Sequence, residues 1–141
     1  MTWRAGWLAV AIMIAVFIFV QSSEPSPSVS NPPLSLIFGA SKTDGTHFWN
    51  DAAHVVAHLA LYCALAYTLQ RATGSTSWPA SLSALFIALA YGVSDELHQS
   101  FVASRDASLF DLGVDAVGTM VGSTLPLLST PWSGGRWRVP R

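Results

Sequence analysis

The stretch Trp7–Val20, WLAVAIMIAVFIFV, decides the fold class of this chain of 141 residues. It contains no charged or polar side chain, and it extends back to Trp3 with only Arg4 and Gly6 as interruptions. About 20 helical residues cross the hydrocarbon core of a bilayer, so this segment is long enough to span it. The whole chain is 51% hydrophobic and 11% charged, less than half of the roughly 25% charged residues usual in soluble domains. We therefore predict a small integral membrane protein.

The first apolar segment also has features of a secretory signal peptide. A single Arg4 precedes its apolar core, and Val20 and Ser22 are placed for cleavage after Ser22. We favour a retained transmembrane helix in residues 1–22, because the apolar core is long for a signal peptide and further apolar segments follow. Cleavage after Ser22 would leave the rest of the predicted arrangement unchanged.

Three more apolar segments follow, in residues 52–69, 79–94 and 112–128. Each predicts a helix of nearly spanning length. Together with the first segment they predict an all-α integral membrane protein, in which four transmembrane helices form a small bundle.

The remaining parts of the chain are polar. Residues 23–50 are rich in serine and proline and predict an extracytoplasmic linker without a core of its own. Residues 51–128 form the predicted three-helix membrane domain, with polar connections in 70–78 and 95–111. Residues 129–141 form a basic tail.

The basic residues predict the orientation, since short cytoplasmic loops are enriched in lysine and arginine. With the N-terminus inside, the cytoplasmic side holds Arg4, Arg71, Arg136, Arg138 and Arg141. The outer side then holds only Lys42 and Arg105. We therefore predict a multi-pass protein of the plasma (inner) membrane with both termini in the cytoplasm.

This orientation collects the polar side chains of three helix ends at the outer side of the bundle. Ionisable groups at membrane depth are costly and normally face an interior or a wet cavity. We therefore predict an outward-facing polar pocket formed by His54, His58, Tyr62, Asp95, Glu96, His98, Gln99, Arg105, Asp111 and Asp115. The alternative is a structural polar network that joins the helix ends, with Asp111 as a simple helix N-cap.

Residues three or four apart share a helix face. One such face carries His54, His58 and Tyr62. Another carries Asp111, Asp115, Gly118 and Gly122. A third is a stripe of small residues, Ala84, Ala88 and Gly92. Since glycines let helices approach closely, we predict helix packing through Gly92, Gly118 and Gly122, with both aspartates pointing into the bundle and not toward lipid.

Composition and motifs exclude several classes of function. The formal net charge of −1 gives no basic tract for nucleic acid. The lone Cys63 cannot form an intrachain disulfide or a thiolate zinc site. No phosphate-binding loop, zinc-protease motif or serine nucleophile elbow is present. We therefore predict no cofactor and no metal; a metal site, the alternative, would use the two histidines His54 and His58 with nearby carboxylates.

Two segments resemble signatures of a known family. The run Asp95–Arg105, DELHQSFVASR, is followed by Asp111, Asp115 and Gly118, and it resembles the second signature of the VanZ-like family. The run His54–Tyr62, HVVAHLALY, resembles the first signature, in which a tyrosine follows a histidine by four residues. Both occur in the expected order, and the resemblance covers about residues 51–123.

The VanZ-like family takes its name from a teicoplanin-resistance membrane protein. The resemblance therefore implies a cell-envelope protein that acts at the outer membrane face, with a glycopeptide or a cell-wall precursor as its ligand. Arg105 would pair an anionic group of that ligand, and His58, Tyr62, Glu96 and Gln99 would supply further polar contacts. The lipid bilayer is the other partner.

Two other classes of function stay open. One is a membrane-embedded hydrolase or transferase acting on a lipid-linked substrate, in which the acids and histidines divide the acid and base roles. The other is a non-catalytic structural subunit of a membrane complex. The sequence predicts no particular oligomeric state.

Overall fold

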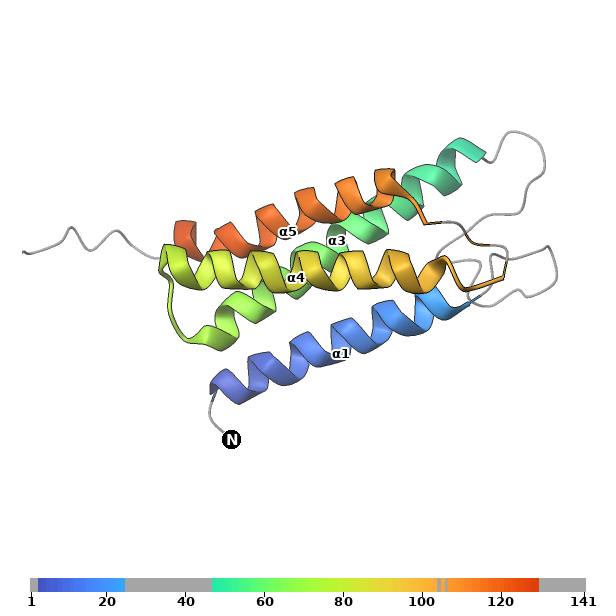
Figure 1. The fold of residues 1–141 in the computed structure, drawn as a ribbon. Helices are drawn as coiled ribbons and strands as arrows, with labels where there is room; N and C mark the ends of the chain where they lie inside the picture. Colours follow the sequence, from blue (N-terminus) through green and yellow to red (C-terminus); the bar gives the residue numbers. More distant parts are fainter. Residues whose placement is uncertain (1–2, 25–46, 104, 106, 130–141) are drawn as a thin grey trace, which may run out of the picture.

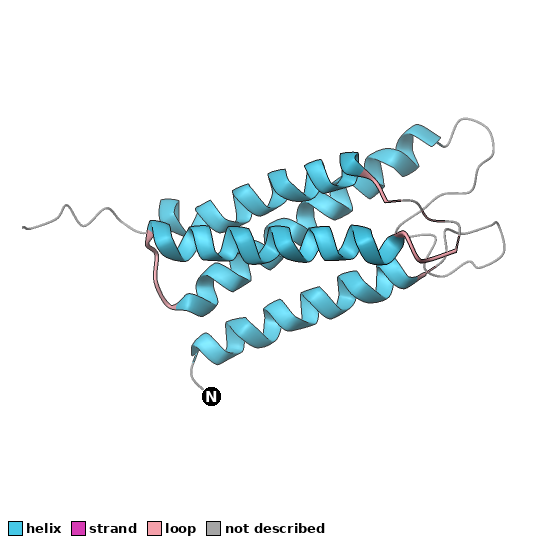
Figure 2. Cartoon of the chain, viewed as in Figure 1, coloured by secondary structure: helices cyan, strands magenta, loops and turns pink. Residues whose placement is uncertain are grey.

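The computed structural model describes residues 3–24, 47–103, 105 and 107–129. This part of the chain is helical throughout apart from short connections (Figures 1 and 2). Its helices are α1 (Trp3–Ser23), α3 (His47–Thr73), α4 (Trp78–Gln99) and α5 (Leu109–Ser129). Most of the predicted linker and the basic tail lie outside the described residues, as do Lys42, Arg136, Arg138 and Arg141.

Three of the described helical segments are long and apolar enough to cross a membrane: Trp3–Ser23, Ala52–Thr73 and Trp78–Gln99. The prediction of an all-α membrane protein is therefore confirmed. Helix α5 has 21 residues, but aspartate, threonine and serine side chains interrupt its apolar sequence. The fourth span and the cytoplasmic location of both termini stay predictions.

The connection between α3 and α4 begins with a glycine that ends α3. Gly74 has a φ of 72°, a left-handed conformation that glycine adopts without a steric penalty. Its amide donates a hydrogen bond to the Arg71 carbonyl at 3.1 Å. Helix α4 then begins after Ser77, which is extended, and a proline occupies the first turn, where its missing N–H costs nothing.

Helix α4 is longer than its apolar run predicts. The predicted connection from Asp95 is wrong for its first five residues, since the helix continues to Gln99. Polar side chains do not end a helix by themselves, and here Asp95, Glu96 and Gln99 are buried against the neighbouring helices. The boundary of apolar sequence is therefore not the boundary of the helix.

The helices run alternately up and down, so their ends gather at two opposite ends of the bundle (Figure 1). We call the end where α1 and α4 finish and α3 and α5 begin the carboxylate end. We call the opposite end, where α1 and α4 begin and α3 and α5 finish, the arginine end. The predicted polar residues from three helix ends therefore do share one end of the bundle.

Helices α3 and α5 pack most extensively, and α1 covers α3 and α4. The contact between α3 and α5 depends on glycine. A Cβ atom at Gly118 would lie 2.5 Å from the Leu59 carbonyl oxygen, and one at Gly122 would collide with the Cys63 carbonyl. The apolar core beside this contact is small, with Ala11, Ile18, Tyr62, Leu65, Ala66 and Ala88 buried.

Candidate functional site

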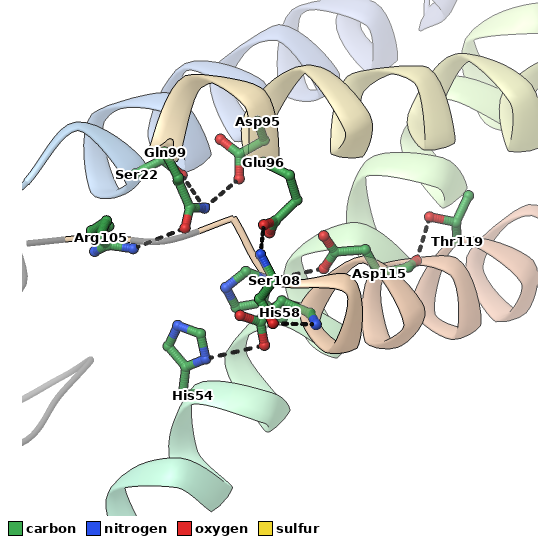
Figure 3. Close-up of polar contacts among 11 residues, drawn as sticks. Ser22, His54, His58, Asp95, Glu96, Gln99, Arg105, Ser108, Asp115 and Thr119 are labelled. Carbon is green, nitrogen blue, oxygen red and sulfur yellow. Dashed lines mark hydrogen bonds and ion pairs between the residues drawn. The ribbon is translucent and has the colours of Figure 1, made fainter. Parts of the chain in front are cut away.

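Polar side chains at the carboxylate end form two connected groups (Figure 3). The first, which we call the histidine–carboxylate cluster, lies where α3, α4 and α5 meet and consists of His54, His58, Tyr62, Glu96, Asp111 and Asp115. The second, which we call the α1 network, joins the end of α4 and the following loop to α1 and consists of Ser22, Ser23, Asp95, His98, Gln99 and Arg105. All ten residues predicted for the pocket belong to one of these groups.

The centre of the histidine–carboxylate cluster is a hydrogen-bonded pair of side chains between α3 and α5. The Nδ1 atom of His58 lies 2.9 Å from an Asp115 carboxylate oxygen. Asp115 is 0% exposed, and a buried carboxylate is tolerated only when it is paired. The hydroxyl of Thr119, one turn further on, donates to the Asp115 carbonyl at 2.6 Å. Asp115 therefore points into the bundle, as its shared face with the glycines predicts.

A second, looser pair lies nearer the end of the bundle. The Nδ1 atom of His54 is 3.8 Å from an Asp111 carboxylate oxygen, and the two histidine rings lie 4.4 Å apart. Asp111 does not cap α5, which begins two residues earlier. The N-cap is Ser108, whose hydroxyl accepts a hydrogen bond from the Asp111 amide at 3.1 Å.

Glu96 connects the end of α4 to the beginning of α5. One of its carboxylate oxygens accepts a hydrogen bond from the Ser108 amide at 2.6 Å. A carboxylate is favourable here because the first amides of α5 carry the positive end of the helix dipole. Ser108 is not among the predicted site residues, although a serine three residues before an acidic residue is a common helix-start signal.

Gln99 is the junction of the α1 network. Its side-chain amide donates to an Asp95 carboxylate oxygen at 3.1 Å and to the Ser22 hydroxyl at 3.3 Å. Its side-chain oxygen accepts a hydrogen bond from Arg105 at 3.4 Å. Gln99 thus fixes the end of α4 against α1. Ser22 was missed because no periodic pattern singles it out within a serine-rich stretch.

Arg105 closes the carboxyl-terminal end of α1. Its guanidinium donates to the Glu24 carbonyl at 3.0 Å and to the Gln21 carbonyl at 3.2 Å. Carbonyls at a helix end lack intrahelical partners, and a cation is favoured there. Within the described residues, Arg105 forms no ion pair with a carboxylate of the cluster. Its donors are therefore directed at the backbone and not at the histidine–carboxylate cluster.

His98 also faces α1. Its Nε2 atom lies 3.0 Å from the Ser23 hydroxyl, and its ring stacks on Phe19 at 4.5 Å. It therefore stands apart from His54 and His58. Of the predicted pocket residues, His98, Gln99 and Arg105 are the three whose contacts are directed toward α1.

Some buried oxygen atoms at this end have no hydrogen-bond partner in the described part of the chain. One oxygen each of Glu96 and Asp115 is among them. The Tyr62 hydroxyl and the Asp95 carboxylate interact with each other. Gly92 lies among these side chains, since a Cβ there would be 3.3 Å from the Tyr62 ring and 3.7 Å from Asp115 Oδ2. No group of three or more metal-ligating side chains within the described residues is arranged to hold a metal ion.

These features define the class of the protein. It is a helical membrane protein with paired histidines and carboxylates at one end of its bundle. The chain matches the family model described as VanZ/LLP1 over residues 7–129. It therefore belongs to the VanZ/LLP1 family, and the matched region includes most of α1 as well as the three later helices. Comparisons with curated proteins and with solved structures gave no match.

Proposed function

We propose that this VanZ/LLP1 protein acts at the outer face of the plasma membrane. There its carboxylate end would form a pocket that recognises a glycopeptide or a cell-wall precursor and lowers susceptibility to teicoplanin. One observation carries the proposal: a buried carboxylate oxygen of Glu96 and one of Asp115 have no hydrogen-bond partner in the described residues. Buried polar atoms are normally paired, so a ligand that completes them is favoured.

The chemistry of these atoms specifies the ligand group. Ionised carboxylate oxygens only accept hydrogen bonds, and both of these atoms are carboxylate oxygens. The ligand must therefore supply donors, as an ammonium or hydroxyl group does. Arg105, which the family resemblance assigns to an anionic group of the ligand, already donates to carbonyls of α1. We therefore assign recognition to the acidic residues and to amine or hydroxyl groups of the ligand.

The second candidate function is a hydrolase or transferase acting on a lipid-linked substrate. The pair between His58 and Asp115 favours it, because a buried carboxylate on Nδ1 orients the ring and leaves Nε2 on the opposite edge to move a proton. This candidate requires turnover of a substrate, whereas the first requires only binding.

A susceptibility test distinguishes these functions. The host must lack an outer membrane, since that barrier would itself exclude teicoplanin. Four strains are compared: without the protein, with the wild type, with Glu96→Gln and with Ser94→Ala. Glu96→Gln replaces an unpartnered acceptor by a donor, while Ser94 is exposed and its hydroxyl donates only to the Tyr91 carbonyl within α4.

We expect the wild type and Ser94→Ala to raise the inhibitory concentration of teicoplanin and Glu96→Gln to lose this effect at an equal amount of membrane protein. A wild type without effect refutes the resistance role. Full protection by Glu96→Gln would mean that the cluster is structural. Turnover of a lipid-linked substrate by the purified wild type, but not by His58→Gln, would favour the enzyme.

A further inference from the structure

The arginine end of the bundle carries positive charge without a matching negative charge. Arg4 lies in the first turn of α1, and Arg71 lies in the last turn of α3. In the described residues every acidic side chain belongs to segments at the carboxylate end, on the opposite side of the bundle. An anion is therefore the natural partner of this end.

Arg4 is already engaged with the backbone. Its guanidinium donates to the carbonyls of Ala72 and Thr73, and its side chain lies against Gly74. These bonds satisfy the last carbonyls of α3, which have no partner within the helix. Arg4 thus closes α3 and leaves anion binding to the other arginine.

Arg71 is held by aromatic rings and not by acceptors. The centre of its guanidinium lies 5.6 Å from the ring centroids of both Trp3 and Trp7. Such contacts cover the two faces of the planar guanidinium. They do not use its N–H donors, which point outward in the plane. The buried Nε atom has no hydrogen-bond partner in the described part of the chain. Arg71 is therefore a positioned donor without an acceptor.

A hollow lies beside Arg71 and is lined by Trp3, Gln70, Arg71, Gly74, Ser75 and Thr76. Its volume of about 80 Å³ is well below the roughly 300–1,000 Å³ of pockets for drug-sized ligands. It suits a small polar group such as a phosphate. Trp3 is 55% exposed at its rim, and tryptophan is enriched at the headgroup level of membranes.

Gln70 places a second requirement on the ligand. Its side chain is 0% exposed, and its amide nitrogen donates to the Ser75 carbonyl at 2.9 Å. Its side-chain oxygen is buried and has no partner in the described residues. This oxygen needs a donor, whereas Arg71 needs an acceptor. A ligand that satisfies both must combine an anionic oxygen with a hydroxyl or amine.

We propose that this hollow binds the headgroup of an anionic phospholipid, with the phosphodiester on Arg71 and a headgroup hydroxyl on the Gln70 side-chain oxygen. Phosphatidylglycerol has both groups. Phosphatidylcholine has the phosphodiester but no hydrogen-bond donor, and its fixed positive charge opposes Arg71. The site is independent of the function proposed for the carboxylate end.

The test is lipid binding to the full-length protein in detergent, measured by native mass spectrometry. Phosphatidylglycerol and phosphatidylcholine are titrated separately, and inorganic phosphate is added as a competitor. Arg71→Gln removes the proposed contact, and Arg138→Gln removes the same charge from the carboxyl-terminal tail. Arg71→Lys keeps the charge but loses the planar fork of donors.

We expect the wild type to prefer phosphatidylglycerol and Arg71→Gln to bind it roughly tenfold more weakly, the factor for one lost charge-assisted hydrogen bond. Arg138→Gln should bind like the wild type, and Arg71→Lys should be intermediate. Equal binding of both lipids by the wild type overturns the proposal without any variant. Equal effects of Arg71→Gln and Arg138→Gln also overturn it, and displacement by inorganic phosphate would assign the hollow to free phosphate instead.

Discussion

An alanine at position 122 directly tests the packing of α5 against α3. A Cβ on Gly122 would collide with the carbonyl oxygen of Cys63 and lie 2.8 Å from its carbonyl carbon. These atoms belong to the backbone of α3, so no side-chain rotation can relieve the clash. The two helices must separate, or α5 must shift along α3. Either movement would also disturb the pair between His58 and Asp115.

Gly113 provides the matched control on the same helix. A Cβ there would meet nothing within 4 Å. Replacing glycine by alanine in a helix favours folding by roughly 0.5–1 kcal/mol, because the unfolded chain loses freedom. Both variants receive this gain, so the difference between them isolates the clash. Overpacking costs about 1–3 kcal/mol, and we expect the upper end of that range because backbone atoms collide.

The measurement is the free energy of unfolding in mixed micelles titrated with a denaturing detergent, followed by circular dichroism. We expect Gly113→Ala to be as stable as the wild type or more stable, and Gly122→Ala to be less stable than Gly113→Ala by about 2–3 kcal/mol. Equal stability of the two variants would refute the close approach of α3 and α5. The same titration on Gly118→Ala should give a smaller loss, since its nearest contact is less severe.

His58→Leu should destabilise the protein by about 3–5 kcal/mol because it leaves Asp115 buried and unpaired. Adding Asp115→Leu should recover most of this lost stability in the same titration. A double variant as unstable as His58→Leu would contradict the pairing. Arg105→Lys loses the fork that closes α1, so amides near Glu24 should exchange hydrogen faster by mass spectrometry; unchanged exchange would mean that these bonds are dispensable. A cysteine replacing Ser104, with Cys63 changed to alanine, should be labelled from outside the cell; labelling only from the cytoplasm would reverse the predicted orientation.

The interhelical pairs of the histidine–carboxylate cluster were predictable because helix periodicity limits where a side chain can point. Four-residue spacing put His54 and His58 on one face of α3 and Asp111 and Asp115 on one face of α5. The structure places these faces opposite each other, with each histidine beside one aspartate. The glycines below them indicated which face of α5 approaches another helix. Helix periodicity and residue size together therefore predict most of this contact.

The contacts of the α1 network were not predictable in the same way. Gln99 and Arg105 reach Ser22, Gln21 and Glu24, which lie more than 75 residues earlier in the chain. Two of these contacts use backbone carbonyls, which leave no mark on the amino-acid sequence. Nothing in the serine-rich stretch after the first helix distinguishes Ser22 from its neighbours. Contacts of this kind become visible only when the position of α1 against α4 is known.

The two arginines that close helix ends explain how the charges are distributed between the ends of the bundle. Arg105 donates to the last carbonyls of α1, and Arg4 donates to the last carbonyls of α3. Both positions are favoured by the negative end of a helix dipole. The count of basic residues on each side of the membrane uses both arginines only to predict the orientation. In that count Arg105 lies on the outer side, which has fewer basic residues. Its contacts with α1 give it a structural reason to remain there, so its location is not a signal against the predicted orientation.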